Sequence, residues 1–436
     1  MMGPRLDRIG RFSARGERVQ NLASLINVEN LRMIHGIMDG KKATGIDQVD
    51  KESYEENLEE NLQVLVKRMK SGGYYPRPSR RVYIDKPGSR KKRPLGISCY
   101  EDKLVENALA EILTAVYEPK FLDFSYGFRP GRNCHQAISE TIGHIQGLTS
   151  YVVEADIRSF FDTLDHDWLM KMLEHDIADK RLLELVHRFL KAGIMEQGKK
   201  LESDKGSPQG NGASPVLANV YLHYVLDLWF EKVVRPRCAG QAHLIRYADD
   251  FVCTFQCKGD ANRFYNTLPK RFEKFGITLA EEKTRIIEFG RFAEVDRRER
   301  GEGKPMTFDF LGFTFYCGKS KKGTFLVRLK SARKKMTSKL KKMSAWLKSN
   351  RDMKVSLLLD KLGRSLRGYY NYYCVAGNSW SINTFLFLIR KLLFKWLNRR
   401  SQKRSYNWSQ FNDLMKTCPL PTPKRWTFIY DLRTEN

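Results

Sequence analysis

The chain has 436 residues, 42% of them hydrophobic, which is enough for two or three domains with cores of their own. Its 77 Lys and Arg outnumber its 50 Asp and Glu, and the net charge of +27 predicts a polyanionic partner, usually nucleic acid. No apolar run reaches the length of a membrane span, and no apolar stretch follows the basic N-terminus as in a secretory signal, so we expect a cytoplasmic protein with no membrane partner.

The positive charge is concentrated near the C-terminus. Residues 318–436 contain 28 Lys or Arg and five Asp or Glu, a net charge of +23, so the rest of the chain is close to neutral. A surface that only has to be soluble does not need this asymmetry. The last quarter is therefore expected to bind phosphates, with an affinity that falls steeply as salt rises.

The predicted elements begin with mostly helical residues 1–75, where apolar residues recur at helical spacing over 21–37 and 53–69. Two prolines then exclude a helix over 74–78. Strands at 82–84 and 95–97 flank a basic loop, which predicts a β-hairpin with a cationic tip. An amphipathic helix follows over 101–117.

A buried strand over 151–157 contains Asp156 near its end, and Asp165 is expected to cap a helix that starts at His166. The elements expected after it are helices over 216–230 and 261–275, a strand over 286–289, a strand pair or bend over 308–315, and helices over 331–348, 354–373 and 382–400. The loop 318–323 is the expected boundary, which divides the chain into a helical extension (1–75), an α+β region (76–317) and an all-α basic region (318–436). The eight cysteines show no zinc-type spacing, and we expect reduced thiols.

The segment RYADD at 246–250 has apolar, β-prone residues on both sides, which predicts two short strands joined by a tight turn. Adjacent carboxylates at such a turn repel each other unless a cation is present, and Mg²⁺ binds one or two carboxylates together with waters and substrate phosphates. If the strand that contains Asp156 lies beside this turn, three carboxylates meet at one edge and suit phosphoryl transfer with two metal ions. A solvated acidic turn and a simple helix cap are the alternatives.

Three segments in this order resemble the motifs of reverse transcriptases: EADIRSFFD at 154–162, GSPQG at 206–210 and RYADD at 246–250. The likeness is strongest to the reverse transcriptase/maturases of bacterial group II introns. It extends over about residues 20–415 and includes YGFRPGR at 126–132, EKT at 282–284, FLGF at 310–313, and RSLRGYYNYY at 364–373, which is similar to the core of the maturase domain, or domain X.

The resemblance implies a right-hand polymerase, with α+β fingers and palm followed by a helical thumb and maturase domain. It assigns metal binding to Asp156, Asp249 and Asp250, with the Ile157 carbonyl as a further ligand of two Mg²⁺ ions, which Mn²⁺ could replace. It places near the incoming nucleotide Ile157, Arg80, Lys86, Arg93, Phe161 and Gln209. The Phe161 ring would clash with a ribose 2′-hydroxyl, although either Phe160 or Phe161 must belong to the core.

Further roles implied by the resemblance concern nucleic acid. The residues expected at primer or template are Tyr247, Leu311, Gly312, Arg129 and Arg132. Lys283 matches a lysine near the catalytic turn, but a local salt bridge to the neighbouring glutamates is as good an interpretation. Asn211 stands where the family has a glycine, and we expect the loop to survive because Asn tolerates left-handed φ.

In the basic tail, cations alternate with aromatic residues. Phe387, Phe394 and Trp396 are expected in its core, and the candidate RNA-binding face consists of Arg364, Arg367, Arg399, Arg400, Lys403 and Arg404. The expected partners are intron RNA, an RNA template with a DNA primer, deoxynucleoside triphosphates and target DNA.

The function predicted from these residues and from the resemblance is RNA-directed DNA synthesis by a group II intron protein that also assists splicing and retrohoming. Because the last histidine is His243, we expect no His-Asn-His endonuclease. One alternative is a domesticated reverse transcriptase that acts in phage defence, CRISPR spacer acquisition or DNA repair. Another is a non-catalytic splicing cofactor, against which the three intact aspartates argue.

Overall fold

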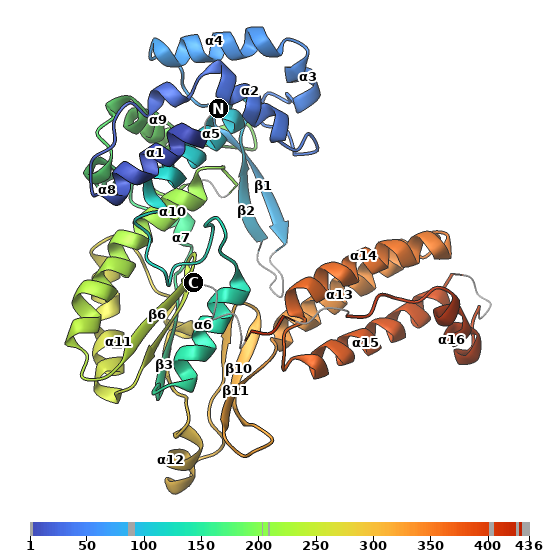
Figure 1. Cartoon of the computed structure of the whole chain (residues 1–436). Coiled ribbons are helices and arrows are strands. Elements are labelled where there is room, and N and C mark those ends of the chain that lie inside the picture. Colours follow the sequence, from blue (N-terminus) through green and yellow to red (C-terminus); the bar gives the residue numbers. More distant parts are fainter. Residues whose placement is uncertain are drawn as a thin grey trace. The chain divides into compact units, whose positions relative to one another are not determined.

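A computed structural model describes residues 3–85, 92–202, 204–207, 210–400, 405–423 and 427–429 (Figure 1). These residues form two compact units, which are described separately below. The first contains residues 3–85, 92–134 and 153–286, and the second contains 135–152 and 287–429.

The first unit begins with the expected helices. They are α1 (Gly3–Ala14), a 3₁₀ turn η1 (Ala23–Leu25), α2 (Val28–Ile37), α3 (Lys51–Glu55) and α4 (Leu58–Lys70). Side chains cap two of them at the N-terminus, because Asn27 accepts a hydrogen bond from the Asn30 amide and Asp50 from the Ser53 amide. The single helix expected over 53–69 is therefore two helices.

A four-stranded sheet with the order β2-β1-β4-β5 follows the N-terminal helices. It contains β1 (Ser79–Asp85), β2 (Lys92–Ile97), β4 (Ile194–Glu196) and β5 (Lys199–Leu201). Strands β1 and β2 form the predicted antiparallel hairpin, in which Ile84 pairs with Arg93. The hairpin tip, which includes Lys86, lies outside the described residues. Helix α5 (Tyr100–Tyr117) follows as expected.

A second four-stranded sheet has the order β6-β7-β3-β8, and Figure 1 shows β3 and β6 within it. Its strands are β3 (Tyr151–Asp156), β6 (Ala242–Tyr247), β7 (Asp250–Phe255) and β8 (Arg285–Glu288). Its neighbours in sequence are helices α7 (Phe160–Thr163), α8 (His166–Asp176), α9 (Lys180–Lys191), α10 (Ser214–Leu222) and α11 (Lys258–Glu273). Asp165 caps α8 as predicted, since it accepts from the Trp168 amide.

The helix expected over 216–230 does not stay regular. After Leu222 the chain winds as two π-helical stretches, η2 (His223–Asp227) and η3 (Phe230–Val234), and then as a 3₁₀ turn, η4 (Arg235–Arg237). Such π turns shift the side chains that follow relative to a regular helix and are frequent near functional sites. Here they contain Asp227, which anchors the turn described below.

The second unit contains helices α6 (Cys134–Gln146) and α12 (Ala293–Glu299) and a sheet of order β9-β10-β11. Strands β9 (Phe308–Phe310) and β10 (Phe313–Lys319) confirm the strand pair predicted around Gly312. Strand β11 (Phe325–Ser331) was not expected. It pairs with β10, so the loop 318–323 is the turn of a hairpin.

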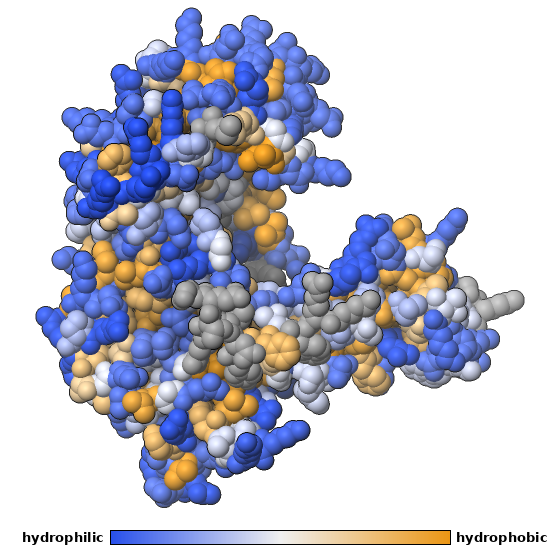
Figure 2. Space-filling model, viewed as in Figure 1, coloured by the Kyte–Doolittle hydropathy of each residue, from blue (hydrophilic) through white to orange (hydrophobic). Residues whose placement is uncertain are grey.

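Four helices complete the second unit: α13 (Arg333–Ser349), α14 (Val355–Tyr373), α15 (Ser379–Leu397) and α16 (Trp408–Thr417). Their core includes Leu362, Leu366, Tyr369, Phe385, Ile389, Leu393 and Trp396. Phe387 was predicted in this core but is 55% exposed, and Phe385, on the opposite side of α15, is buried instead. Hydrophilic side chains cover much of the visible surface over α13 and α14 (Figure 2). Within the described ranges, no helix combines the length and the apolar character of a membrane span.

Candidate active site

Asp156 and the turn that contains Asp249 and Asp250 lie on neighbouring strands. Strand β3 ends at Asp156, and its neighbour β7 begins at Asp250. Tyr247 pairs with Asp250, which leaves Ala248 and Asp249 as a two-residue turn, and Ala248 has the positive φ of 57° that such turns require. The predicted strand–turn–strand element is thus confirmed.

Lys283 links the two carboxylate sites. Its Nζ donates to Oδ2 of Asp156, and this hydrogen bond is the largest cause of the raised pKa of Lys283. Asp250 also raises the pKa of Lys283 through its charge, so the lysine lies within electrostatic range of both strands. The neighbouring Glu282 pairs with Arg158, at 3.2 Å, and acts on Lys283 only through its charge.

Carboxylate oxygens and a cation therefore meet at this sheet edge, although in the described parts of the chain no three His, Cys, Asp or Glu side chains are grouped so that they could hold a metal ion. A complete cage is not needed for Mg²⁺, which takes one or two carboxylates and completes its shell with water and phosphate. The side chain of Asp156 is 25% exposed and is paired with the Lys283 ammonium. The donors present fit a hard divalent ion.

The Ile157 carbonyl, the further metal ligand implied by the resemblance, directly follows Asp156 in the chain. A bridge between Ile157 and Leu279 joins β3 to the segment before Lys283. Its two hydrogen bonds use the Asp156 carbonyl, at 2.8 Å from the Ala280 amide, and the Arg158 amide, at 2.8 Å from the Thr278 carbonyl. Neither bond involves the carbonyl of Ile157.

A buried ion pair fixes the turn formed by Ala248 and Asp249, which is called the catalytic turn below. Arg246 is fully buried, and its guanidinium binds both carboxylate oxygens of Asp227, at 2.7 and 2.5 Å. The same guanidinium donates to the Asn219 side chain, at 2.9 Å, and to the Ala248 carbonyl, at 3.1 Å. The cation thereby fixes the backbone of the turn itself.

The YGFRPGR segment supports the same turn. A Cβ on Gly127 would lie 2.3 Å from the Ala248 amide nitrogen, so only glycine fits there, and Asn219 donates to the Gly127 carbonyl at 2.7 Å. Arg129 was expected at primer or template, but it is buried and bound to Glu118 at 2.8 Å, so its role here is structural. Arg132 pairs with Asp123 at 2.7 Å and remains partly exposed.

Phe160 and Phe161 differ in burial, and Phe160 is the one that belongs to the core. Phe160 is 2% exposed and packs edge-on against Tyr221, whereas Phe161 is only half-buried. The Phe161 carbonyl accepts from the Ser207 amide at 2.7 Å. A Cβ on Gly206 would lie 2.8 Å from that carbonyl, and its φ is +85°, so the close approach requires glycine.

The arginines of the β1–β2 hairpin are arranged differently from the prediction. Arg80 turns away to the Thr44 carbonyl, at 3.1 and 2.6 Å, which corrects its assignment to the nucleotide. Burial raises the pKa of Asp162, and the nearby charges of Arg81 and Arg93 oppose that rise. Arg81 was missed in the sequence, where nothing shows which face of β1 meets the site. Its Nε is buried without a hydrogen-bond partner among the described residues.

The loop that contains GSPQG is partly described, and Gln209 lies outside the described residues. Asn211 does not adopt a left-handed φ, so the reason given for its tolerance was wrong. Its Oδ1 instead accepts from the Ala213 amide at 2.8 Å, which orders the chain just before α10.

In the second unit, the predicted primer turn packs against α14. Leu311 and Gly312 have positive φ values of 47° and 78°. The Tyr372 hydroxyl donates to the Leu311 carbonyl at 2.8 Å, and a Cβ on Gly312 would lie 2.9 Å from the Tyr373 hydroxyl. In the first unit, Tyr247 is half-buried, and burial raises its pKa.

The candidate RNA-binding cations differ in exposure. Arg364 is exposed and pairs with Asp360 on the same helix, and Arg399 lies over the Trp396 ring, 5.7 Å from its centroid. Arg367 is exposed, whereas Arg400 is half-buried and donates to the Met353 carbonyl at 2.7 Å. Lys403 and Arg404 lie outside the described residues.

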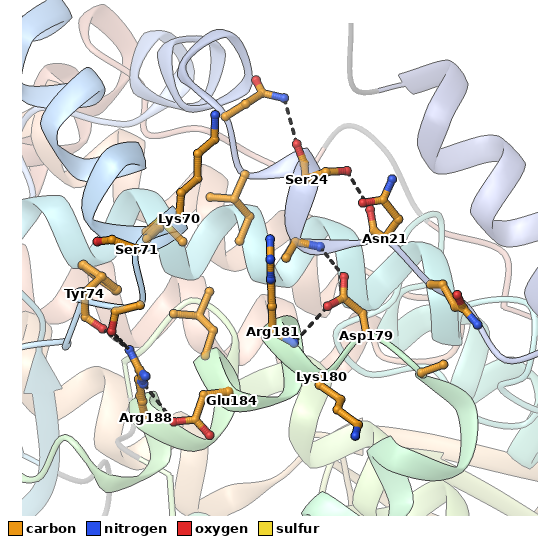
Figure 3. Close-up of a pocket in the computed structure, with 18 residues that line it drawn as sticks. Asn21, Ser24, Lys70, Ser71, Tyr74, Asp179, Lys180, Arg181, Glu184 and Arg188 are labelled. Atoms are coloured by element: carbon orange, nitrogen blue, oxygen red, sulfur yellow. Dashed lines mark hydrogen bonds and ion pairs between the residues drawn. The ribbon is translucent and has the colours of Figure 1, made fainter.

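A cavity of about 1010 Å³ in the first unit shares no lining residue with the catalytic edge (Figure 3). Its polar groups largely satisfy one another. Asp179 accepts from the Ala23 amide at 2.8 Å, and Arg188 donates to the carbonyls of Gly72 and Tyr74, at 2.7 and 2.8 Å. The cavity lies between the N-terminal helices and α9, and we assign no catalytic or binding role to it.

Comparison with known proteins identifies both parts of the chain. The family model described as "Reverse transcriptase (RNA-dependent DNA polymerase)" matches residues 84–315, and the one described as "Group II intron, maturase-specific domain" matches residues 333–412. Strands β2 to β9 and the turn at Leu311 and Gly312 fall within the first match, and three of the four C-terminal helices fall wholly within the second.

Group II intron-encoded protein LtrA of Lactococcus lactis subsp. cremoris is 31% identical over 409 residues, which cover 76% of this chain and 66% of LtrA. Protein YkfC of Escherichia coli K12 is 37% identical over 49% of this chain and 63% of its own length. A telomerase structure from Candida albicans matches remotely, with a TM-score of 0.45 and 12% identity over 86% of this chain and 67% of that chain. The chain thus spans about two thirds of these curated relatives, and its α+β region followed by basic helices belongs to the reverse transcriptase family, in the group with a group II intron maturase domain.

Proposed function

We propose that the chain is an RNA-directed DNA polymerase that extends a DNA primer on an RNA template and binds intron RNA to assist splicing and retrohoming. The observation that carries this proposal is the juxtaposition of Asp156 and Asp250 around one cation, the Lys283 ammonium, at the edge of the β6-β7-β3-β8 sheet. Nucleotidyl transfer with two metal ions needs carboxylates from two strands at one edge of a sheet. Membership of the reverse transcriptase family indicates that the reaction is DNA synthesis on an RNA template.

In this proposal Asp156, Asp249 and Asp250, with the Ile157 carbonyl, hold two Mg²⁺ ions. The chemistry that bound Mg²⁺ supplies is activation of the primer 3′-hydroxyl and neutralisation of charge on the triphosphate. The protein's own part is positioning. The buried Arg246–Asp227 pair fixes the turn, and Arg81, Arg93 and Lys86 attract the triphosphate from the hairpin side.

Phe161 is proposed to select the sugar, because its ring is half-buried at the site while Phe160 fills the core. A ribose 2′-hydroxyl would meet this ring, so deoxynucleotides are preferred. Phe161→Ala is expected to raise ribonucleotide incorporation at least tenfold relative to deoxynucleotide incorporation. Phe160→Ala, the control in the core, is expected to lower stability instead, and an unchanged sugar preference in Phe161→Ala would remove the assignment.

The helical part of the second unit is proposed to bind RNA through its exposed cations. RNA helices are recognised mainly by shape and phosphate contacts, which suit a face of arginines rather than a specific pocket. Arg364, Arg367 and Arg399 supply this face among the described residues, with Lys403 and Arg404 added from the sequence.

The test is primer extension on an RNA template, comparing native protein with Asp249→Asn. Native protein should make full-length product, and the variant should lose about a thousandfold in rate, since roughly 4 kcal/mol of transition-state stabilisation is at stake. Glu59→Gln, whose side chain on α4 is 54% exposed and pairs with Arg32, is the control. Both variants should still accelerate intron splicing. A native protein that makes no product would leave only the RNA-binding role.

A further inference from the structure

Glu106, on α5, is a buried carboxylate that the proposed chemistry does not use. It is 2% exposed, and both of its oxygens are engaged by other elements. Oε1 accepts from the Ser98 hydroxyl at 2.5 Å, just after β2, and Oε2 accepts from the Gly212 amide at 3.0 Å, just before α10. One side chain thus ties the fingers hairpin to the loop that follows Gly206.

That loop touches both the hairpin and the proposed sugar-selecting residue. A Cβ on Gly210 would lie 2.6 Å from the Gly96 carbonyl of β2, so the two backbones are in close contact. At the other end of the loop, the Ser207 amide donates to the Phe161 carbonyl at 2.7 Å, and the Ser207 and Ser214 hydroxyls are 2.5 Å apart. The described contacts therefore run from Glu106 to Gly212, along the chain to Ser214, and from Ser214 through Ser207 to the Phe161 carbonyl.

The burial of this carboxylate needs a reason, because a buried acid costs stability unless its oxygens are satisfied. Burial raises the pKa of Glu106 to about 7, against the opposing effects of the Ser98 and Gly212 hydrogen bonds. The other groups that face it are Asp102 and Lys103 on its own helix and Tyr74 from the segment before β1. An apolar residue would pack in α5 without this cost but could not hold Gly212.

We propose that Glu106 is a positioning residue for nucleotide selection: it holds Gly212 beside the end of β2 and, through Ser214 and Ser207, fixes Phe161 beneath the sugar of the incoming nucleotide. The proposal deepens the polymerase function above and rests on it. Glu106 touches neither substrate nor the reacting atoms, so its effect passes through the loop.

Asp102 provides a matched control on the same helix. It lies one turn away, is equally buried, and accepts from the Tyr74 hydroxyl at 2.5 Å and the Arg77 amide at 3.0 Å. It therefore holds the segment before β1, and it makes no hydrogen bond to the described residues 206, 207 and 210–212. If the substitutions act only by destabilising the region around α5 and the β1–β2 hairpin, the Asp102 and Glu106 variants should behave alike. If Glu106 specifically positions the loop, only the Glu106 variants should change nucleotide selection.

The first experiment measures steady-state primer extension with deoxy- and ribonucleotides for native protein, Glu106→Ala, Glu106→Gln and Asp102→Asn. Glu106→Ala should raise the KM for deoxynucleotides at least fivefold and lower the preference for deoxynucleotides at least threefold, with kcat changed less. Glu106→Gln should restore both within twofold, because its amide oxygen can accept from Gly212 while its NH₂ donates to Ser98. Asp102→Asn should keep the native sugar preference.

The second experiment measures amide hydrogen exchange on the full chain, which does not depend on polymerase activity. Glu106→Ala should speed exchange in 206–212 at least tenfold, and Asp102→Asn should speed it only in 74–79. Equal effects of both variants, or native sugar preference in Glu106→Ala, would overturn the proposal. If Glu106→Ala does not fold, Ser98→Ala removes one of the two hydrogen bonds of Glu106 and must shift KM in the same direction. An inactive native protein would refute the polymerase function, while exchange would still test whether Glu106 positions the loop.

Discussion

The charged pair that fixes the backbone of the catalytic turn is fully buried, whereas the charged side chains of helices α14 and α15 are mostly exposed. Arg246 and Asp227 are both fully buried and bind each other through two hydrogen bonds. Arg364, in contrast, is 70% exposed and pairs only with a neighbour on its own helix. The first arrangement fixes a backbone to within a narrow range of positions, and the second leaves cations available to phosphate. Substitutions should therefore have large, local effects in the first region and small, additive effects in the second.

The sharpest test of this comparison removes one arginine from each region. Arg246→Met leaves Asp227 buried without its cation and frees the Ala248 carbonyl, so it should lower the free energy of unfolding by about 3–5 kcal/mol. Arg364→Met breaks an exposed helical pair and should change it by less than about 0.5 kcal/mol. Thermal and urea unfolding of both variants would measure the difference, and similar losses would break the comparison.

The buried acids of α5 extend the first region's pattern and predict a pH dependence. The pKa of Glu106 is raised to about 7 in the folded protein, from 4.5 in an unfolded chain. Its contribution to stability is therefore fully present below about pH 4.5 and is lost as the pH rises through 7. Glu106→Gln does not ionise, so it should gain stability relative to native protein between pH 5 and pH 8, by up to about 3 kcal/mol.

Thermal melting of the two proteins at pH 5 and pH 8 would measure this gain. Asp102, whose pKa is raised to about 6 by burial, is present in both proteins, and its charge adds to the rise in the pKa of Glu106 only in the native one. A difference in melting temperature that stays constant with pH would show that Glu106 keeps an ordinary pKa.

A third test concerns two adjacent arginines of β1, whose roles differ because they face opposite sides of the strand. Arg81 lies near Asp162 beside the proposed nucleotide site, whereas Arg80 is held by the Thr44 carbonyl. Arg81→Ala should raise the KM for deoxynucleotides at least tenfold, since a hydrogen bond to a charged group contributes about 1.5–3 kcal/mol. Arg80→Ala should leave that KM within twofold and lower stability instead. The reverse order would restore the assignment made from the sequence.

These arginines also show where the sequence stops being informative. Long helices, the Asp165 cap and the strand–turn–strand around Ala248 follow from periodicity and local turn chemistry, which neighbouring residues alone determine. The side of β1 that meets the site depends on a carbonyl 36 residues away, at Thr44. Arg129 looked like a phosphate ligand because it is a cation in a motif, yet its partner Glu118 turned it inward.

The same limit applies in the helical region. Phe385 and Phe387 are two residues apart on a helix with apolar residues on several sides, so spacing alone does not identify the buried one. In the structure Phe385 is buried, and its ring stacks on Tyr369 with the two centroids 3.9 Å apart. Phe387 is exposed. Of the candidate site, the aspartates and Lys283 could be singled out from the motifs, but the partner of Lys283 and the positions of Arg81 and Glu106 needed the tertiary contacts.

The smallest expected effects are those of single exposed arginines, and their signature is salt dependence rather than affinity. Each cation that neutralises a phosphate releases counterions, so its loss reduces the slope of log affinity against log salt by about 1. Arg367→Ala and Arg399→Ala should each show this reduction for an intron RNA transcript while costing less than about 1 kcal/mol in affinity at physiological salt. Arg235→Ala, an exposed arginine of the first unit that pairs with Glu231 at 2.7 Å, is the control and should keep the native slope. Because the two losses come from independent contacts, the double variant should reduce the slope by about 2, and a slope unchanged by either substitution would move the RNA-binding face elsewhere on the chain.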